Sequence, residues 1–258
     1  MILLNQDLGY NHINKKYFMS VILTGYTSSI GKALLNNFLA QGKNVTCLGR
    51  SDIPNEICNN FKDLKKKIFL DFKSNSFEND LEEIYSDLNA EEINTIIHAA
   101  ADTGKRNLLK NLNYQEISDL ITINYLNSAW FLKKSCDLLS LNKNSFNKSF
   151  IYISTQLAKY KGPGLSIYSS SKASAELLIR SYIESFLINN EEVSIATARA
   201  GNVLGGESKK KLYNDIIKKQ ANKYLKSLDP EAKLSFEKFD RSETTQDLVP
   251  VYGVKITN

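Results

Sequence analysis

Tyr168 and Lys172 lie four residues apart in a stretch that we predict to be helical over about 166–189, so their side chains share one helix face. An ammonium near a phenol stabilises the phenolate and lowers a tyrosine pKa that is about 10 in water, which allows proton exchange near neutral pH. The lysine can also donate to the ribose hydroxyls of a cofactor. Thr155, which closes the preceding apolar run, can hold a substrate oxygen. The same spacing also arises by chance on solvated helices, so other motifs must support it.

A glycine-rich turn follows the first apolar run. Residues 24–31 read TGYTSSIG and lead into a helical pattern over about 30–41. A strand, a glycine turn and a helix N-terminus together bring backbone N–H groups close to a pyrophosphate. Serine replaces the usual middle glycine, and a tight turn without a ligand would have a similar pattern. The residues that we expect at the pyrophosphate are Gly25, Thr27, Ser28, Ser29, Ile30 and Gly31.

The ends of the next three apolar runs predict the rest of a dinucleotide site. Arg50 lies about 20 residues past the turn, where an acidic residue would bind the ribose of NAD; its charge and fork geometry suit a 2′-phosphate instead. We therefore expect NADP(H) in preference to NAD(H), although a surface arginine would read the same way. Asp71 and Phe72 are placed at the adenine edge, and the small residues Ala99–Ala101 would let the cofactor cross the sheet edge. His98, just before them, is expected to be a strand-end histidine rather than a catalyst.

The elements that must position these residues alternate along the chain. Short apolar runs at Val21–Thr24, Val45–Leu48, Ile68–Leu70, Ile93–His98, Phe150–Ser154 and Val193–Thr197 read as strands buried on both faces. Helical patterns over about 30–41, 76–89, 114–140 and 166–189 lie between them. This alternation predicts an α/β fold with a doubly wound parallel sheet. We expect an N-terminal arm at 1–18, the dinucleotide-binding domain at 19–206, and a small C-terminal substrate-binding extension at 207–258.

Composition limits the function classes. The chain of 258 residues has a net charge of +5, with lysine and arginine spread along it rather than clustered, so we expect no nucleic-acid surface. No apolar run approaches the length of a membrane span. Three cysteines and two histidines match no metal or disulfide pattern, so we expect no metal site. A reducing, cytoplasmic compartment fits best.

Taken together, these motifs resemble those of the short-chain dehydrogenase/reductase superfamily. The resemblance covers about residues 20–206 and rests on TGYTSSIG (24–31), HAAA (98–101), IST (153–155), YSSSK (168–172), ARAGNVLGG (198–206) and Asn124. The last segment is similar to the extended branch, whose members act on nucleotide sugars. The resemblance implies hydride transfer at a nicotinamide beside Thr155, Tyr168 and Lys172, with Asn124 supporting the proton relay or the helix geometry. It places Tyr168, Lys172, Ala200 and Val203 at the cofactor, and Thr155, Gln156 and Asn202 at the substrate, with Arg199 closing a strand.

Two departures leave the substrate open. Gln156 and Leu157 follow Thr155 where nucleotide-sugar dehydratases carry an acidic pair, which favours a reductase or an epimerase. The region after Gly206 is also short for the extended branch. The leading interpretation is a nucleotide-sugar reductase or epimerase; the alternatives are a reductase of a smaller carbonyl compound and a dinucleotide-binding protein without turnover. The two long helices, over 114–140 and 166–189, could form a homodimer interface.

Overall fold

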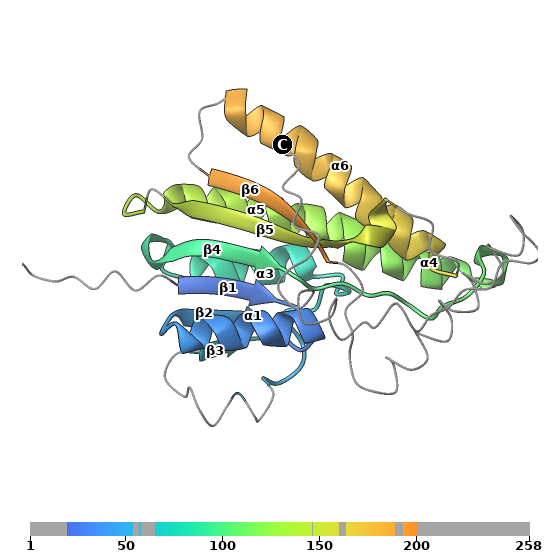
Figure 1. Cartoon of the computed structure of the whole chain (residues 1–258), viewed down its shortest axis with the longest axis horizontal. Coiled ribbons are helices and arrows are strands. Elements are labelled where there is room, and N and C mark those ends of the chain that lie inside the picture. Colours follow the sequence, from blue (N-terminus) through green and yellow to red (C-terminus); the bar gives the residue numbers. More distant parts are fainter. Residues whose placement is uncertain are drawn as a thin grey trace, which may run out of the picture.

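The structure is a computed structural model that describes residues 20–53, 57, 65–145, 147–159, 164–188 and 193–200. Its centre is a six-stranded parallel sheet with the strand order β3-β2-β1-β4-β5-β6 (Figure 1). The strands are β1 (Ser20–Thr24), β2 (Asn44–Leu48), β3 (Lys65–Ile68), β4 (Ile93–His98), β5 (Lys148–Thr155) and β6 (Val193–Ala200). The order reverses between β1 and β4, which is where doubly wound sheets bind ligands, at the carboxyl ends of the strands. The predicted fold class is confirmed.

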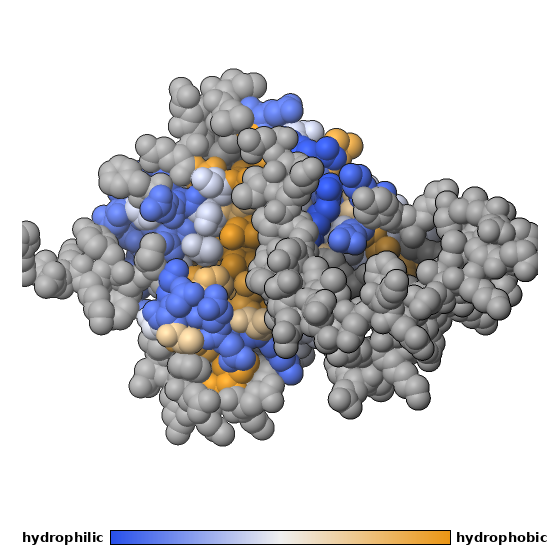
Figure 2. Space-filling model, viewed as in Figure 1, coloured by the Kyte–Doolittle hydropathy of each residue, from blue (hydrophilic) through white to orange (hydrophobic). Residues whose placement is uncertain are grey.

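Helices cover the two faces of the sheet. The described helices are α1 (Ser29–Ala40), α3 (Phe77–Ser86), α4 (Tyr114–Ile121), α5 (Asn127–Leu141) and α6 (Ser166–Ile188). Helix α1 lies on one face, and α3, α5 and α6 lie on the other (Figure 1). On the face seen in Figure 2, apolar side chains form a band over the strands, flanked by polar patches.

Strand β1 shows why its apolar run is continuous rather than alternating. Val21 and Leu23 pack with α1, whereas Ile22 between them belongs to the core on the opposite face. All three side chains are fully buried. Successive strand residues point to opposite faces, so a strand covered on both sides needs apolar residues at every position.

The third predicted strand was placed too late. The run at Ile68–Leu70 suggested a strand there, but β3 is Lys65–Ile68 and includes three lysines. Because β3 is the edge strand and pairs only with β2 among the described strands, charged side chains are tolerated on it. Leu70 and Phe72 are buried beyond the strand end and form part of the core.

The helix predicted over 114–140 is interrupted. A π-helical turn at Thr122–Leu126 separates α4 from α5. The Ser128 hydroxyl donates to the carbonyl oxygen of Ile123 (2.9 Å), so a side chain serves one of the carbonyl groups in the widened turn. Such turns interrupt helices most often at functional sites, and this one carries Asn124.

None of the described helices has the length and apolar content needed to cross a membrane. The predicted arm at 1–18 and the predicted extension at 207–258 lie outside the described residues.

Candidate active site

A pocket of about 280 Å³ lies where β1, β2, β3 and β4 end. Nine residues predicted to bind a cofactor line it: Gly25, Thr27, Ser28, Arg50, Asp71, Phe72, Ala99, Ala100 and Ala101. Seven further residues line it that the sequence did not identify: Tyr26, Leu48, Gly49, Ser51, Leu70, Asp102 and Ile123. Most of these seven are sequence neighbours of predicted ones, so strand-end position alone could have found them. Ile123 comes from the π-helical turn, which no sequence pattern indicated.

Ser29, Ile30 and Gly31 do not line this pocket; they form the first turn of α1. Ser28 is the helix N-cap: its Oγ accepts from the Gly31 backbone N–H (3.0 Å) and donates to the carbonyl oxygen of Gly25 (2.8 Å). A Cβ atom on Gly31 would lie 2.1 Å from that same carbonyl oxygen. The glycine is therefore required for close packing of the helix against the turn, which is one of the roles glycine has in dinucleotide folds.

Arg50 and Asp71 lie close to each other in the lining of the pocket. The Arg50 Nε atom lies 3.7 Å from Asp71 Oδ1, and the arginine side chain is 64% exposed. Asp71 also accepts the backbone N–H of Lys73 (2.9 Å), which orients its carboxylate. An exposed pair at this distance contributes little free energy. The guanidinium can therefore leave Asp71 for a stronger anion at small cost.

His98 is enclosed in a directed hydrogen-bond chain. The Thr24 hydroxyl oxygen accepts the backbone N–H groups of Ala99 (3.1 Å) and Ala100 (3.0 Å), so its own hydrogen points to His98 Nδ1 (2.8 Å). The imidazole proton is then on Nε2, which donates to Ser128 Oγ (2.8 Å). Burial, with a smaller contribution from Lys172, lowers the pKa of His98 well below its usual value. This neutral residue ties the end of β4 to the end of β1, as expected of a strand-end histidine.

Phe72 has a similar supporting position. Its ring stacks on the imidazole of His98, with centroids 5.0 Å apart, and the side chain is 6% exposed. The Asn127 amide donates to its carbonyl oxygen (2.8 Å). Phe72 thus closes the floor of the pocket as part of the core.

Asn124 is fully buried and holds the segment that follows β4. Its Nδ2 donates to the carbonyl oxygen of Asp102 (2.7 Å), and its Oδ1 accepts the Asp102 backbone N–H (2.9 Å). Both polar ends of the amide are engaged by one backbone unit. Of the two roles implied by the family resemblance, this geometry supports the positioning role.

Lys172 lies in α6 and is 2% exposed. Its Nζ donates to the carbonyl oxygen of Ile153 in β5 (2.8 Å) and lies 4.1 Å from the centroid of the Tyr152 ring. Burial lowers the pKa of Lys172 to about 7, and the carboxylate of Glu176 opposes part of that effect. The ammonium is thus poised to lose a proton near neutral pH.

Tyr168 and Thr155 meet where α6 begins and β5 ends. Burial raises the pKa of Tyr168, and a hydrogen bond with the Thr155 hydroxyl lowers it in part. Lys172 is not among the causes of the Tyr168 pKa shift, contrary to the expected lowering, because a lysine with a pKa of about 7 has lost its charge before Tyr168 ionises. The register pairs His98 with Tyr152, so the segment after β4 runs beside the last residues of β5. Thr155, Tyr168 and Lys172 therefore come together around the end of β5, at the same edge of the sheet as the pocket, and none of the three lines the pocket itself.

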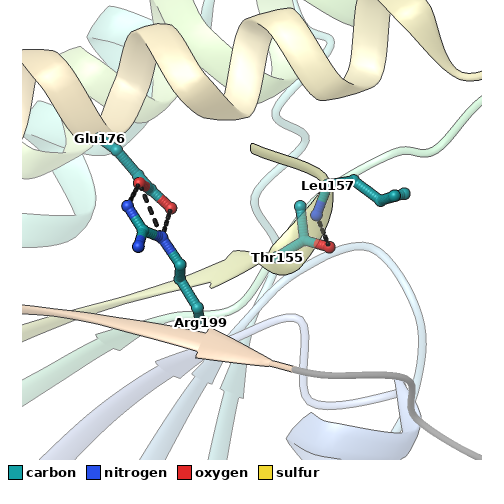
Figure 3. A network of polar contacts seen from close by, with 4 residues as sticks. All are labelled: Thr155, Leu157, Glu176 and Arg199. Carbon is teal, nitrogen blue, oxygen red and sulfur yellow. Dashed lines mark hydrogen bonds and ion pairs between the residues drawn. The ribbon is translucent and has the colours of Figure 1, made fainter. Parts of the chain in front are cut away.

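A buried ion pair holds α6 to β6. Glu176, one turn past Lys172, receives hydrogen bonds on both carboxylate oxygens from Arg199, at 2.9 and 3.0 Å from Nε and at 2.5 Å from Nη2 (Figure 3). The side chains are 5% and 23% exposed. Figure 3 also shows Thr155 at the end of β5, where its Oγ1 accepts the backbone N–H of Leu157 (3.3 Å).

The remaining predicted residues are placed only in part. Ala200 is the last residue of β6 and does not line the pocket, and Gln156 begins a short turn after Thr155. Asn202 and Val203 lie outside the described residues. Within the described ranges, no group of histidine, cysteine and acidic side chains is arranged to hold a metal ion.

A doubly wound sheet with a glycine turn, a strand-end pocket and an adjoining Thr-Tyr-Lys set defines the class of NAD(P)-dependent oxidoreductases. The family model for short chain dehydrogenases matches residues 19–215. The chain belongs to the short-chain dehydrogenase family.

A curated relative gives a more specific comparison. The dTDP-D-glucose 4,6-dehydratase of Dictyostelium discoideum is 28% identical over 222 residues, which are 76% of this chain and 46% of that protein. This chain thus spans about half the length of that relative. The match is consistent with the resemblance to the extended branch.

Solved structures share the fold. Serine dehydrogenase from Escherichia coli superposes with a TM-score of 0.62 at 18% identity, covering 71% of this chain and 82% of that one. The closed form of serine dehydrogenase with NADP+ gives 0.63 at 18% identity, covering 72% and 73%. A short-chain dehydrogenase/reductase from Burkholderia vietnamiensis gives 0.58 at 16% identity, covering 70% and 84%. At such identities the likeness concerns the fold alone.

Proposed function

We propose that this chain is an NADP(H)-dependent reductase or epimerase of a nucleotide sugar, with Tyr168 as the proton donor and acceptor. The observation that supports the proposal is that Thr155, Tyr168 and Lys172 come together around the end of β5, at the edge of the sheet where the pocket also lies. A bound nicotinamide would supply or accept the hydride. The protein would supply a proton at the Tyr168 hydroxyl and a hydrogen bond from Thr155 to the reacting oxygen.

Lys172 has a dual role in this proposal. A cofactor ribose hydroxyl can replace the Ile153 carbonyl as the acceptor of its ammonium proton. The same movement would bring positive charge nearer to the phenol, and an approaching cation lowers the pKa of a tyrosine. Tyr168, whose pKa is raised in the ligand-free geometry, would thus become a better proton donor only once the site is filled.

The pocket has the chemistry that a dinucleotide requires. Gly25 adopts a φ of 67° and lies against the backbone of Ala99, so this part of the pocket wall is bare backbone rather than side chain. Arg50 supplies positive charge at the opposite end, where a 2′-phosphate would lie. Separating Arg50 from Asp71 costs little free energy, because the two groups are 3.7 Å apart and the arginine is exposed. These features favour NADP(H) over NAD(H).

The nucleotide-sugar assignment rests on weaker ground: the segment 198–206 and the dehydratase of Dictyostelium discoideum. Gln156 stands where a carboxylate would be needed for elimination, so we propose reduction or epimerisation rather than dehydration. In this proposal Asn202 and residues 207–258 bind the substrate. A reductase of a smaller carbonyl compound is the second candidate, because the family model that matches residues 19–215 is that of short chain dehydrogenases.

Two secondary proposals accompany the function. Exposed apolar side chains on the long helices, Ile121, Leu126 and Leu177, support a homodimer through α4, α5 and α6. The odd number of cysteines, whose spacing matches no disulfide framework, supports a reducing compartment such as the cytoplasm.

The test is a titration of the protein with NADPH and NADH, followed by nicotinamide fluorescence. We expect tighter binding of NADPH. Arg50→Ala should weaken NADPH binding about 10- to 100-fold, the range for a charge-assisted contact, and leave NADH nearly unchanged. Arg180→Ala, at an exposed arginine of α6, is the matched control. If neither cofactor binds, the oxidoreductase proposal is wrong.

Turnover tests the chemical roles. Candidate nucleoside-diphosphate sugars and small carbonyl compounds are offered with NADPH, and the oxidation of the cofactor is followed by absorbance. Tyr168→Phe should lower turnover by about 10²- to 10⁴-fold. It should keep cofactor affinity within about two-fold, because the ring remains. Turnover of small carbonyl compounds alone would favour the second candidate.

A further inference from the structure

Tyr26 is an unexpectedly large residue in the phosphate turn, and the described structure buries it under the neighbouring loop. The side chain is 1% exposed, and its hydroxyl donates to the carbonyl oxygen of Ser51. A Cβ atom on Gly49 would lie 2.9 Å from its Cε1 atom. The ring therefore fills the space beside Gly49 and requires glycine there. Tyr26, Gly49 and Ser51 all line the pocket.

The loop that Tyr26 contacts is held on both sides of Arg50. Two backbone hydrogen bonds join Gly49 to the segment at the end of β3. Its N–H donates to the carbonyl oxygen of Ile68 (3.2 Å), and its carbonyl oxygen accepts the N–H of Leu70 (3.4 Å). On the other side, Tyr26 holds the carbonyl of Ser51. Further along, Asp52 accepts a hydrogen bond from Lys67 Nζ (2.6 Å), so the Tyr26–Ser51 contact is the anchor that lies nearer to Arg50 on this side.

Tyr26 also belongs to the turn that would face the pyrophosphate. It follows Gly25 directly, so one side chain spans from that turn to the loop carrying Arg50. In a 2′-phosphorylated dinucleotide the pyrophosphate and the 2′-phosphate are attached to the same ribose, which limits the range of distances between them. A fixed separation between the two protein segments therefore favours that ligand by preorganisation.

We propose that Tyr26 is a positioning residue for cofactor specificity, which holds the Gly49–Ser51 loop so that Arg50 meets the 2′-phosphate of the dinucleotide. The inference rests on the proposed function and deepens it. Burial, assisted by Cys47 and Asp52, raises the pKa of Tyr26 to about 12, so the hydroxyl remains a donor throughout the usual assay range.

The decisive variant is Tyr26→Phe, which keeps the ring beside Gly49 and removes only the hydroxyl. NADPH and NADH are titrated by nicotinamide fluorescence. We expect the ratio of NADPH to NADH affinity to fall about five-fold, the effect of one hydrogen bond, while NADH affinity stays within about two-fold. Gly49→Ala, which forces the loop away from the ring, should lower the same ratio. The two changes combined should lower it by less than the product of their separate effects, because both act on one loop.

Tyr85→Phe is the matched control, because Tyr85 also loses a buried hydroxyl contact, to Ser135 Oγ (2.8 Å), away from the pocket. It should lower the melting temperature as much as Tyr26→Phe does, without changing the affinity ratio. If Tyr26→Phe weakens both cofactors equally, or changes neither, the specificity role is wrong while the proposed function stands. If the wild-type chain binds neither cofactor, both proposals fall together.

Discussion

Replacement of Lys172 by methionine should make the folded protein more stable at low pH, by an amount that decreases as the pH rises. Lys172 is buried, and its pKa falls from 10.5 to about 7 on folding. Between those values the unfolded chain binds a proton that the folded chain has released, so the stability of the wild type rises with pH across that range. Below about pH 7 both states bind the proton, and the folded state bears the full cost of burying it.

The magnitude follows from the two pKa values. A difference of about 3.5 corresponds to roughly 5 kcal/mol of unfolding free energy at pH 6. At pH 9 the folded lysine is already neutral and only the unfolded lysine remains to be titrated, so the loss of unfolding free energy due to Lys172 is roughly 2 kcal/mol. Methionine removes this cost but also loses the hydrogen bond to the carbonyl of Ile153, which subtracts about 1 kcal/mol at every pH. The difference between variant and wild type should therefore shrink by roughly 3 kcal/mol from pH 6 to pH 9.

The assay is urea unfolding of wild type and Lys172→Met at several pH values, followed by circular dichroism. Comparison of the two proteins at each pH cancels the titration of all other groups that behave alike. Lys110→Met, at an exposed lysine, is the matched control for the loss of one lysine. Parallel stability curves for wild type and Lys172→Met would refute the reasoning, because they would mean that Lys172 keeps its ordinary pKa in the fold.

Three further changes have expected outcomes. Gly31→Ala places a Cβ atom 2.1 Å from the Gly25 carbonyl oxygen, so we expect misfolding of the turn and loss of NADPH fluorescence enhancement, with retained binding as the contrary result. Glu176→Leu removes the carboxylate that Arg199 binds and should lower the unfolding free energy by about 3 to 5 kcal/mol in urea titrations, whereas Glu176→Leu with Arg199→Met should recover much of the loss. Asn124→Leu removes both contacts to one backbone unit and should cost about 2 to 4 kcal/mol by the same measurement; a loss below about 1 kcal/mol would argue against the positioning role.

The sequence predicted the sheet well because its strands are buried on both faces. The continuous run at Val21–Thr24 has no alternation, and that absence is itself the sign of burial by helices on each side. The same reasoning failed at Lys65–Ile68. This is an edge strand, which does not need apolar residues at every position, and it carries lysines. The apolar pattern instead predicts a strand near Leu70, because the buried side chains of this part of the chain lie just after β3.

Site residues were predictable where a motif fixes backbone geometry, and not where tertiary contacts decide. Gly31 and Ser28 act within eight residues of one turn, so their pattern is visible in one dimension. The π-helical turn around Asn124 depends on a backbone partner 22 residues away, and periodicity alone continues smoothly through it. The partnership of Tyr26 with Ser51 is likewise a contact between separate turns.

The burial of Lys172 bears on whether the chain has retained turnover. The side chain is 2% exposed, the ammonium contacts a backbone carbonyl and an aromatic ring, and its pKa of about 7 marks a net cost to the folded state. A scaffold that only needed to fold would be more stable with an apolar residue at this position, and stabilising replacements at functional sites characteristically reduce activity. A perturbed pKa beside a pocket is typical of catalytic groups. If the Lys172→Met variant is more stable than the wild type at pH 6 but inactive, the lysine is kept for turnover. That result would favour an enzyme over a protein that only binds the dinucleotide.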